Sequence, residues 1–338
     1  MVTDMRVKCV VGEGSNRVVV GNFMLREASE GEVLVKTIFS AISPGTELRC
    51  LAGNEPNAGR FPMITGYSLV GEVLRGAGAI REGDLVFLNG TSVCPVGITS
   101  SWGGHISHAI APASQAVKLP KDIDLRMASA LSMLSIAMHG VCKAAPLPGD
   151  NVLVAGQGLI GQFAASFMKM AGCRVAVCDP VRFRLDVASR MGIELTYQVN
   201  DGWQDKFRGD FPDGVDTLID ATGSPKAVAA NAPLLRAKSW KNQYQSSPKL
   251  VLLASYPGNI SLDYQETLFN KEVEVVTCRT YLPHERERAI RLLEMGMLDI
   301  TPILTATMPV DQAPEAFRLL REDASRYITI ILDWRGSN

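Results

Sequence analysis

Three glycines that follow an apolar run form the strongest chemical signal in the sequence. Gly156, Gly158 and Gly161 stand in the pattern GxGxxG within NVLVAGQGLIGQFAASFMKMAGCRVAVCD. In a strand–turn–helix unit, the first glycine permits a tight turn, the second lets the backbone approach a pyrophosphate, and the third lets the helix pack on the strand. The phosphates would lie on the positive helix N-terminus, beside Leu159 and Ile160. The pattern predicts a dinucleotide site; the alternative is a glycine-rich turn that binds no nucleotide.

A carboxylate ends the second strand-like run. Asp179 stands about 20 positions after the glycines. There it can accept hydrogen bonds from an adenosine ribose and would repel a 2′-phosphate, so the sequence favours NAD over NADP. Arg182 and Arg184 follow closely and could soften this preference. Alternatively, both are solvated residues in the first turn of the next helix.

Two further strand ends carry polar residues. Thr222 and Gly223 follow the run DTLIDA, and Ser255 and Tyr256 follow KLVLLA. Because ligands of parallel sheets gather at the carboxyl ends of the strands, we expect these four residues to contact the cofactor as well.

The elements that must position these residues change character near residue 120. Short β-like runs separated by Gly, Pro and Asn fill the chain up to that point, and 127–145 suits one or two helices. Beyond Gly149, apolar runs alternate with amphipathic segments, which predicts a parallel sheet with helices on both faces. The C-terminal part reads helix, helix, strand and is expected to return to the first unit. The segment 236–249 is a longer connection, which suits a surface insertion, a lid or an oligomer contact.

Composition describes an ordinary soluble globular protein. The chain has 338 residues, a formal net charge of -1, 46% hydrophobic and 20% charged residues, so two domains are expected and nucleic acid is not expected as a partner. No apolar run reaches the ~18 residues needed to span a bilayer, and the N-terminus lacks a signal-peptide pattern. Seven cysteines without a CxxC pair fit reduced thiols, so we expect a cytoplasmic protein without a membrane partner.

Four segments resemble the medium-chain dehydrogenase/reductase superfamily over essentially the whole chain. They are GEVLVKTIFSAISPGTE, FPMITGYSLVGEV, GGHISHAIAPASQAVKLP and PGDNVLVAGQGLIGQ. The resemblance implies an α/β fold, with a GroES-like β-barrel catalytic domain at 1–128 and 282–338 and a Rossmann doubly wound parallel sheet at 129–281. It also implies a homo-oligomer, commonly a dimer or tetramer. The motifs ISPGTE and IILDW and the Gly66-Tyr67 pair are most similar to the group that includes bacteriochlorophyllide dehydrogenase, which oxidises a secondary alcohol with NAD.

The resemblance also locates where zinc-dependent members hold their catalytic metal. Those members carry a cysteine where Pro44 stands, a histidine at Tyr67, a glutamate at Ser68, and usually a cysteine at Leu131 or Ser132. Zinc requires several nitrogen or thiolate donors, and proline offers none. The four cysteines of the structural zinc lobe are also absent from 86–104. The sequence therefore predicts a member without zinc.

Without a metal, an organic acid or base must serve the reacting oxygen. Tyr67 is the first candidate, because it stands where the ligand histidine of the family points into the cleft; the alternative is an aromatic packing residue. Glu47 could orient the catalytic loop or take part in proton transfer. His139 lies close to where the family chain passes the nicotinamide, although a helix histidine with satisfied hydrogen bonds is the alternative. His105 and His108 are expected to be structural.

Three functions remain open at this point. The first is an NAD-dependent oxidoreductase acting on a small-molecule secondary alcohol or ketone without zinc, with NADP still possible as cofactor. The second is a zinc-free ene or quinone reductase of the same fold, which would prefer NADPH. The third is a nucleotide-binding module without turnover.

Overall fold

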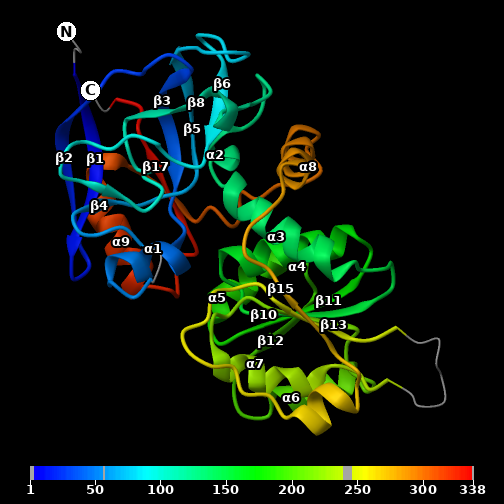
Figure 1. The fold of residues 1–338 in the computed structure, drawn as a ribbon. Helices are drawn as coiled ribbons and strands as arrows, with labels where there is room; N and C mark the ends of the chain where they lie inside the picture. Colours follow the sequence, from blue (N-terminus) through cyan, green and yellow to red (C-terminus); the bar gives the residue numbers. More distant parts are fainter. Residues whose placement is uncertain (1–3, 56–57, 239–245, 337–338) are drawn as a thin grey trace. The chain divides into compact units, whose positions relative to one another are not determined.

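The computed structural model describes residues 4–55, 58–238 and 246–336. The chain divides into two compact units. Unit 1 comprises Met1–Met133 and Glu287–Asn338, and unit 2 comprises Leu134–Arg286. Figure 1 shows unit 1 in blue, cyan and red and unit 2 mainly in green and yellow. Within the described ranges, no helix is both long and apolar enough to cross a membrane.

Unit 1 is built on two β-sheets. One has the strand order β2-β1-β4-β7, and the other runs β16-β17-β3-β5-β6-β9 with β8 paired to β3. The strands are β1 (Met5–Gly14), β2 (Arg17–Leu25), β3 (Glu32–Ala41), β4 (Met63–Ile64), β5 (Leu69–Arg75), β6 (Leu85–Leu88), β7 (Thr99–Ser100), β8 (His108–Pro112), β9 (Val117–Lys118), β16 (Ala306–Pro309) and β17 (Ile330–Asp333). The hairpin between β1 and β2 turns on Ser15 and Asn16, both at positive φ. Two such residues make the turn type that matches the right-handed twist of paired strands.

The C-terminal segment completes the larger sheet of unit 1. β17 pairs antiparallel with β3, with Ile331 opposite Ala41. The fully buried Trp334 follows and donates its backbone N–H to the Ile38 oxygen over 3.0 Å. The helices of this unit are α1 (Pro44–Leu51), α2 (Leu125–Ala128) and α9 (Ala313–Glu322). α9 contributes Phe317 to a core cluster with residues of α1 and β17.

The motif ISPGTE, which directly follows β3, contains the start of helix α1. Ser43 is the N-cap of α1 and Pro44 occupies its first turn. Proline suits this position because its fixed φ is helical and its missing N–H would have no partner within the helix. Glu47 thereby comes to lie on the inner side of α1, where it is fully buried.

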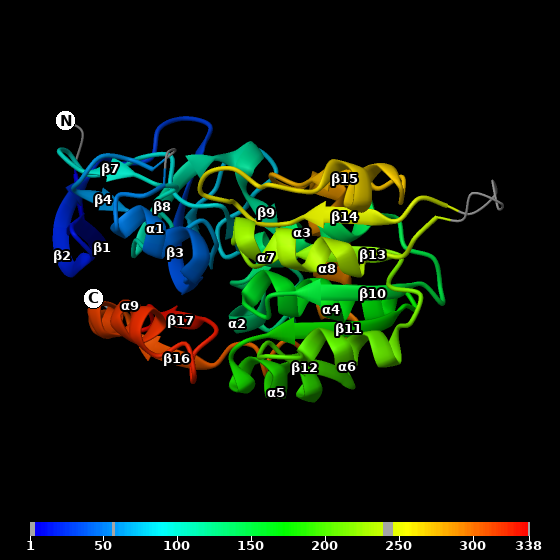
Figure 2. The same cartoon turned by 90° about the horizontal axis from the view of Figure 1, so that it is seen from below.

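Unit 2 contains a six-stranded, fully parallel sheet of order β12-β11-β10-β13-β14-β15. Its strands are β10 (Asn151–Ala155), β11 (Arg174–Asp179), β12 (Leu195–Gln198), β13 (Thr217–Asp220), β14 (Lys249–Leu252) and β15 (Glu274–Thr277). Figure 2 shows them one above another, from β15 at the top to β12 at the bottom. Its helices are α4 (Leu159–Met170), α5 (Arg182–Arg190), α6 (Trp203–Asp210) and α7 (Pro225–Asn231). α3 (Leu131–Ala144) and α8 (Pro283–Glu294) span the boundaries between the units.

Helices cover both faces of this sheet, as predicted. α4 lies on one face, and α6 and α7 lie on the other (Figure 1). Leu153 and Ala155 of β10 belong to the core cluster that includes Phe207 of α6 and Val228 of α7. Strands covered on both faces read as continuous apolar runs, which explains NVLVA and RVAVC. The α/β fold with a parallel-sheet nucleotide domain is therefore confirmed.

Part of the connection 236–249 lies outside the described residues, at 239–245. Its two described ends are joined by Arg236. The guanidinium lies 2.6 Å from the Asp216 carboxylate and donates to the Ser246 backbone oxygen over 2.5 Å.

Candidate active site

The glycine turn of unit 2 joins β10 to α4. Gly156 has a φ of +86° and donates its N–H to the Cys178 oxygen of β11 over 2.8 Å. A Cβ on Gly161 would lie 1.8 Å from the Gly156 oxygen, so only glycine lets the helix pack here. A Cβ on Gly158 would meet no atom within 4 Å.

The N-terminus of α4 is open to an anion. Gly158 is its N-cap and offers no side chain to the amides of the first turn, where Leu159 and Ile160 lie. Uncapped helix amides beside an open glycine fit the pyrophosphate of a dinucleotide.

Asp179 fixes the end of β11 to this turn. Its side chain is buried, and Oδ2 accepts the Gln157 N–H over 2.7 Å while Oδ1 accepts the Val181 N–H over 2.8 Å. Each carboxylate oxygen can accept a further hydrogen bond, as a ribose would require. Arg184 places Nη1 3.6 Å from Oδ2. Arg182 instead pairs with Asp186 on the surface over 2.8 Å, so Arg184 alone of the two arginines lies beside Asp179.

The other two predicted strand ends meet at Asp220. Asp220 Oδ1 accepts from the Thr222 hydroxyl over 2.7 Å and from the Tyr256 hydroxyl over 2.9 Å. A Cβ on Gly223 would lie 3.3 Å from the Ser255 oxygen, which places the two loops side by side. Burial, with the Asp220 charge second, raises the pKa of Tyr256, and burial also raises the pKa of Asp220. Asp220 was not among the predicted site residues, although a carboxylate at the end of a parallel strand is a usable signal.

In unit 1, Tyr67 lies against the start of α1. Its hydroxyl is 2.5 Å from Ser43 Oγ, and the Ser43 N–H donates to Glu47 Oε1 over 2.7 Å. Burial raises the pKa of Tyr67 to about 12, and hydrogen bonds from Ser43 and Thr46 oppose the shift. The phenol therefore carries its proton at neutral pH, which suits a proton donor.

A buried carboxylate–imidazole pair supports this arrangement. Glu47 and His105 are both fully buried, and His105 Nε2 lies 2.8 Å from Glu47 Oε2, which also accepts from the Thr65 hydroxyl over 2.8 Å. His105 Nδ1 lies 2.9 Å from Ser40 Oγ, which accepts the Trp334 indole N–H over 2.8 Å. Because a carboxylate oxygen accepts, the Nε2–H of His105 donates to Glu47. Sequence reasoning missed this pair because its members are 58 residues apart.

The positions at which the family resemblance places zinc ligands do come together in unit 1. Ser132 donates its N–H to Ser68 Oγ over 3.3 Å and its hydroxyl to the Tyr67 backbone oxygen over 2.5 Å. Ser132, rather than Leu131, therefore stands beside Tyr67. The set offers hydroxyls and a proline, without the thiolate and imidazole donors that zinc prefers, so these residues do not fit the metal. Among the residues with described positions, no group of three or more His, Cys, Asp or Glu side chains is arranged to hold a metal ion.

His139, the third predicted catalytic residue, lies in the part of α3 that belongs to unit 2. Its Nδ1 is 3.0 Å from both carboxylate oxygens of Glu285, and Glu285 also accepts the Leu282 N–H over 2.7 Å. The imidazole thus has a carboxylate partner within its own unit. His108 contacts the Ser107 hydroxyl over 3.0 Å, and burial lowers the pKa of His108.

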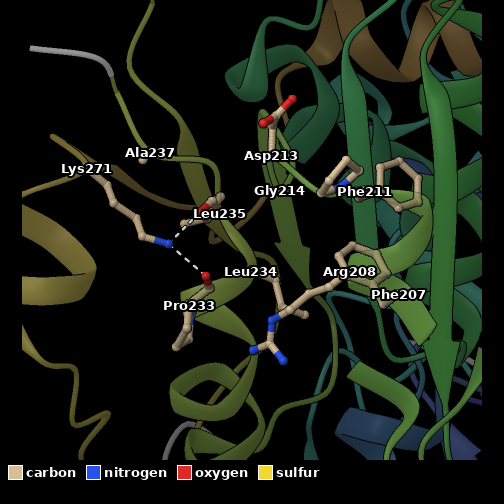
Figure 3. Close-up of a pocket in the computed structure, with 11 residues that line it drawn as sticks. Phe207, Arg208, Phe211, Asp213, Gly214, Pro233, Leu234, Leu235, Ala237 and Lys271 are labelled. Carbon is tan, nitrogen blue, oxygen red and sulfur yellow. Dashed lines mark hydrogen bonds between the residues drawn. The ribbon is translucent and has the colours of Figure 1, made fainter. Parts of the chain in front are cut away.

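A separate hollow in unit 2 is lined by residues that include Phe207, Gly214 and Lys271 (Figure 3). Gly214 lines it just before β13 begins, whereas ligands of parallel sheets bind where strands end. Lys271 donates there to the Pro233 and Leu235 backbone oxygens over 2.7 and 2.5 Å, which satisfies its ammonium internally. This hollow is not the candidate site.

Two segments of the chain match known family models. Residues 29–121 match the model of the alcohol dehydrogenase GroES-like domain, and residues 160–295 match that of the zinc-binding dehydrogenase. The family resemblance places the metal ligands at positions 44, 67, 68, 131 and 132. All five positions lie outside the segment that matches the zinc-binding dehydrogenase model, so this match does not bear on the metal ligands.

Relatives and solved structures cover almost the whole chain. The chain is 28% identical to an L-threonine 3-dehydrogenase of Pyrococcus abyssi, over 89% of this chain and 91% of the relative. It is 26% identical to the 2-desacetyl-2-hydroxyethyl bacteriochlorophyllide A dehydrogenase of Cereibacter sphaeroides, over 98% and 100% of the two chains. An Escherichia coli alcohol dehydrogenase solved with NADH shares the fold, with a TM-score of 0.82, 19% identity, and coverage of 97% and 99%. The chain belongs to the medium-chain dehydrogenase/reductase superfamily and is an NAD(P)-dependent dehydrogenase.

Proposed function

We propose that this enzyme transfers hydride between NAD and a secondary alcohol or ketone without zinc. The observation that carries the proposal is the position of the Tyr67 hydroxyl, which lies 2.5 Å from Ser43 Oγ. By the family resemblance, zinc-dependent members carry a metal-ligand histidine at the position of Tyr67. A phenol with a pKa of about 12 can give a proton to a developing alkoxide, which a metal would otherwise stabilise. We assign this catalytic role to the domain formed by 1–128 and 282–338, and nucleotide binding to 129–281.

Nicotinamide supplies or accepts the hydride when it is bound. The side chains of the protein bind and orient the cofactor and the substrate, and Tyr67 donates or accepts the proton. Gly156, Gly158 and Gly161 open the turn for the pyrophosphate, and Asp179 accepts hydrogen bonds from the adenosine ribose. The carboxylate of Asp179 favours NAD, because a 2′-phosphate beside it would be repelled.

Glu47 positions the proton donor rather than exchanging protons with it. The hydrogen-bonded path from Tyr67 reaches Ser43 Oγ, but Glu47 bonds the backbone N–H of Ser43, which does not relay a proton. Both oxygens of Glu47 are already engaged by donors. The pair with His105 thus holds the start of α1, and the start of α1 holds Tyr67.

The first prediction concerns Tyr67. Tyr67→Phe should lower kcat for ketone reduction by ~10²-fold or more, the usual contribution of a positioned acid, with little change in the affinity for NADH. Steady-state rates with a panel of ketones and hydroxy acids, together with NADH titrations, measure both. Ser92→Ala, which removes an exposed hydroxyl that donates to Gln115, is the control. An unchanged kcat in Tyr67→Phe removes Tyr67 from the mechanism.

Arg184 supports a second candidate, an NADPH-dependent ene or quinone reductase. Its guanidinium lies 3.6 Å from Asp179 and offsets the charge that disfavours a 2′-phosphate. Parallel titrations of NADH and NADPH, followed by rates on an enone panel, separate the two functions. Tighter binding of NADPH together with reduction of the conjugated C=C bond would favour the reductase.

A further inference from the structure

Trp102 has an unusual backbone conformation next to the candidate proton donor. Its φ is +69°, a left-handed region that bulky residues rarely adopt, and its side chain keeps 41% of its surface exposed. Its ring packs edge-on against Tyr67, with 5.1 Å between centroids and 61° between planes. A strained residue that also exposes a large apolar side chain is an observation that asks for a function.

Hydrogen bonds on both sides hold the tryptophan in this conformation. The Ser101 N–H donates to the Ile64 oxygen over 2.8 Å, and the Gly104 N–H donates to the Gly66 oxygen over 2.6 Å. The carbonyl of the tryptophan itself accepts the Thr91 N–H over 3.0 Å. Residues 101–104 are therefore hydrogen-bonded to residues 64–66, which directly precede Tyr67. These bonds hold the indole of Trp102 next to the phenol of Tyr67.

This arrangement combines an aromatic surface with hydroxyl groups. The Tyr67 and Ser43 hydroxyls can bond the oxygen of an alcohol or ketone, while the indole offers its surface to the group attached to the reacting carbon. Aromatic rings pair well with other flat rings, in offset or edge-to-face contact. A short aliphatic chain or a puckered ring covers less of the indole.

We propose that Trp102 is a specificity-determining residue that selects substrates whose carbinol or carbonyl carbon is attached to a flat, conjugated ring. This inference rests on the proposed function, since it places the reacting oxygen at Tyr67. It adds the chemical class of the substituent on the reacting carbon.

The test compares two ketones of equal carbon number, acetophenone with a flat ring and cyclohexyl methyl ketone with a puckered one. In Trp102→Leu, which keeps apolar bulk without an aromatic face, the ratio of kcat/KM for acetophenone to that for cyclohexyl methyl ketone should fall roughly three- to tenfold, mainly through KM for acetophenone. Trp102→Phe should keep most of the wild-type ratio. Val96→Ala, at a fully exposed residue in the connection that precedes β7, should leave the ratio unchanged. Thermal unfolding of each variant verifies its folding.

An unchanged ratio in a folded Trp102→Leu variant overturns the inference, as does a loss of equal size for both ketones. Binding provides a readout that does not depend on turnover. In ligand-observed NMR titrations of the purified protein, Trp102→Leu should weaken the binding of acetophenone and leave the binding of cyclohexyl methyl ketone unchanged. If Tyr67→Phe disproves the proposed acid, the NMR comparison still decides whether Trp102 recognises flat rings, so the two failures are distinguishable.

Discussion

The protonation state of Tyr67 is the central feature at the scale of single residues. Burial raises its pKa to about 12, in contrast to a base that must lose its proton near neutrality. The phenol is therefore ready to act as an acid in ketone reduction across the physiological range. For alcohol oxidation the same shift is a disadvantage, because the active base is the scarce deprotonated form.

This difference predicts opposite pH behaviour for the two directions. Between pH 6 and 9 the kcat of ketone reduction should stay flat, since Tyr67 remains protonated far below its pKa. The kcat of alcohol oxidation should rise by about tenfold per pH unit, because the fraction of phenolate rises in that proportion. Pre-steady-state rates with the cofactor saturating measure the chemical step. A kcat of reduction that falls with rising pH, with its midpoint near pH 7, would instead assign the proton to a histidine.

The Glu47–His105 pair makes a second prediction at this scale. Glu47→Gln places an amide donor opposite donors that the carboxylate now satisfies, on Ser43, Thr65 and His105. Leaving one buried donor without an acceptor should lower the free energy of unfolding by about 1–3 kcal/mol. Urea denaturation measures it, and the exposed Glu82→Gln is the control. Equal stability of the two variants would show that the carboxylate is not needed in the buried network.

At the scale of elements, the glycine turn and its helix separate folding from binding. Gly158 has a φ of -70° and open space around it, whereas Gly161 packs against the Gly156 oxygen. The two glycines thus have different reasons to lack a side chain.

Alanine at these two positions should therefore act differently. Gly158→Ala should fold with only a small loss of stability. It should lower the affinity for NAD by about tenfold or more, because its methyl group lies where the pyrophosphate would approach the backbone. Gly161→Ala should lower the melting temperature strongly, because its Cβ would need to displace backbone. Calorimetric unfolding and NAD titration of both variants check this pair. If both lost stability equally and bound NAD equally, the open space at Gly158 would have no role in binding.

The sequence predicted those elements whose pattern is local. Val152, Val154 and Val177 lie in runs long enough to identify buried parallel strands, and the glycine spacing identified the turn. The helix α1 was not predicted, because Pro44 follows a β-like run and the sequence does not show that Ser43 caps a helix. The short strand β16 (Ala306–Pro309) was not predicted either, since four residues carry little periodicity.

Within the candidate site, the unpredicted features are contacts between distant segments. Glu47 meets His105 only once α1 and the chain after β7 have folded together, and sequence spacing does not encode that meeting. The left-handed backbone of Trp102 contradicts the preference of its residue type and is imposed by hydrogen bonds to residues 64–66. Asp220 accepts hydrogen bonds from Thr222 and Tyr256, which lie 34 positions apart in two different loops. The sequence predicted both residues separately, without their common partner.

At the scale of the whole molecule, the chain combines a nucleotide unit typical of its superfamily with a catalytic unit that lacks the usual metal donors. Unit 2 has the GxGxxG turn and Asp179 at the end of β11, the residues to which we assign cofactor binding. Unit 1 keeps the strand framework but carries Pro44, Tyr67, Ser68 and Ser132 where the resemblance places metal ligands. Under the proposed function, hydride transfer in this enzyme would depend on an organic acid in place of the metal.

The most direct test of this account measures zinc content and turnover on the same purified protein. Mass-spectrometric metal analysis should give well below one zinc per chain, and the rate of ketone reduction should be unchanged after dialysis against a chelator and after addition of zinc chloride. Stoichiometric zinc whose removal abolishes turnover, and whose return restores it, would contradict the account.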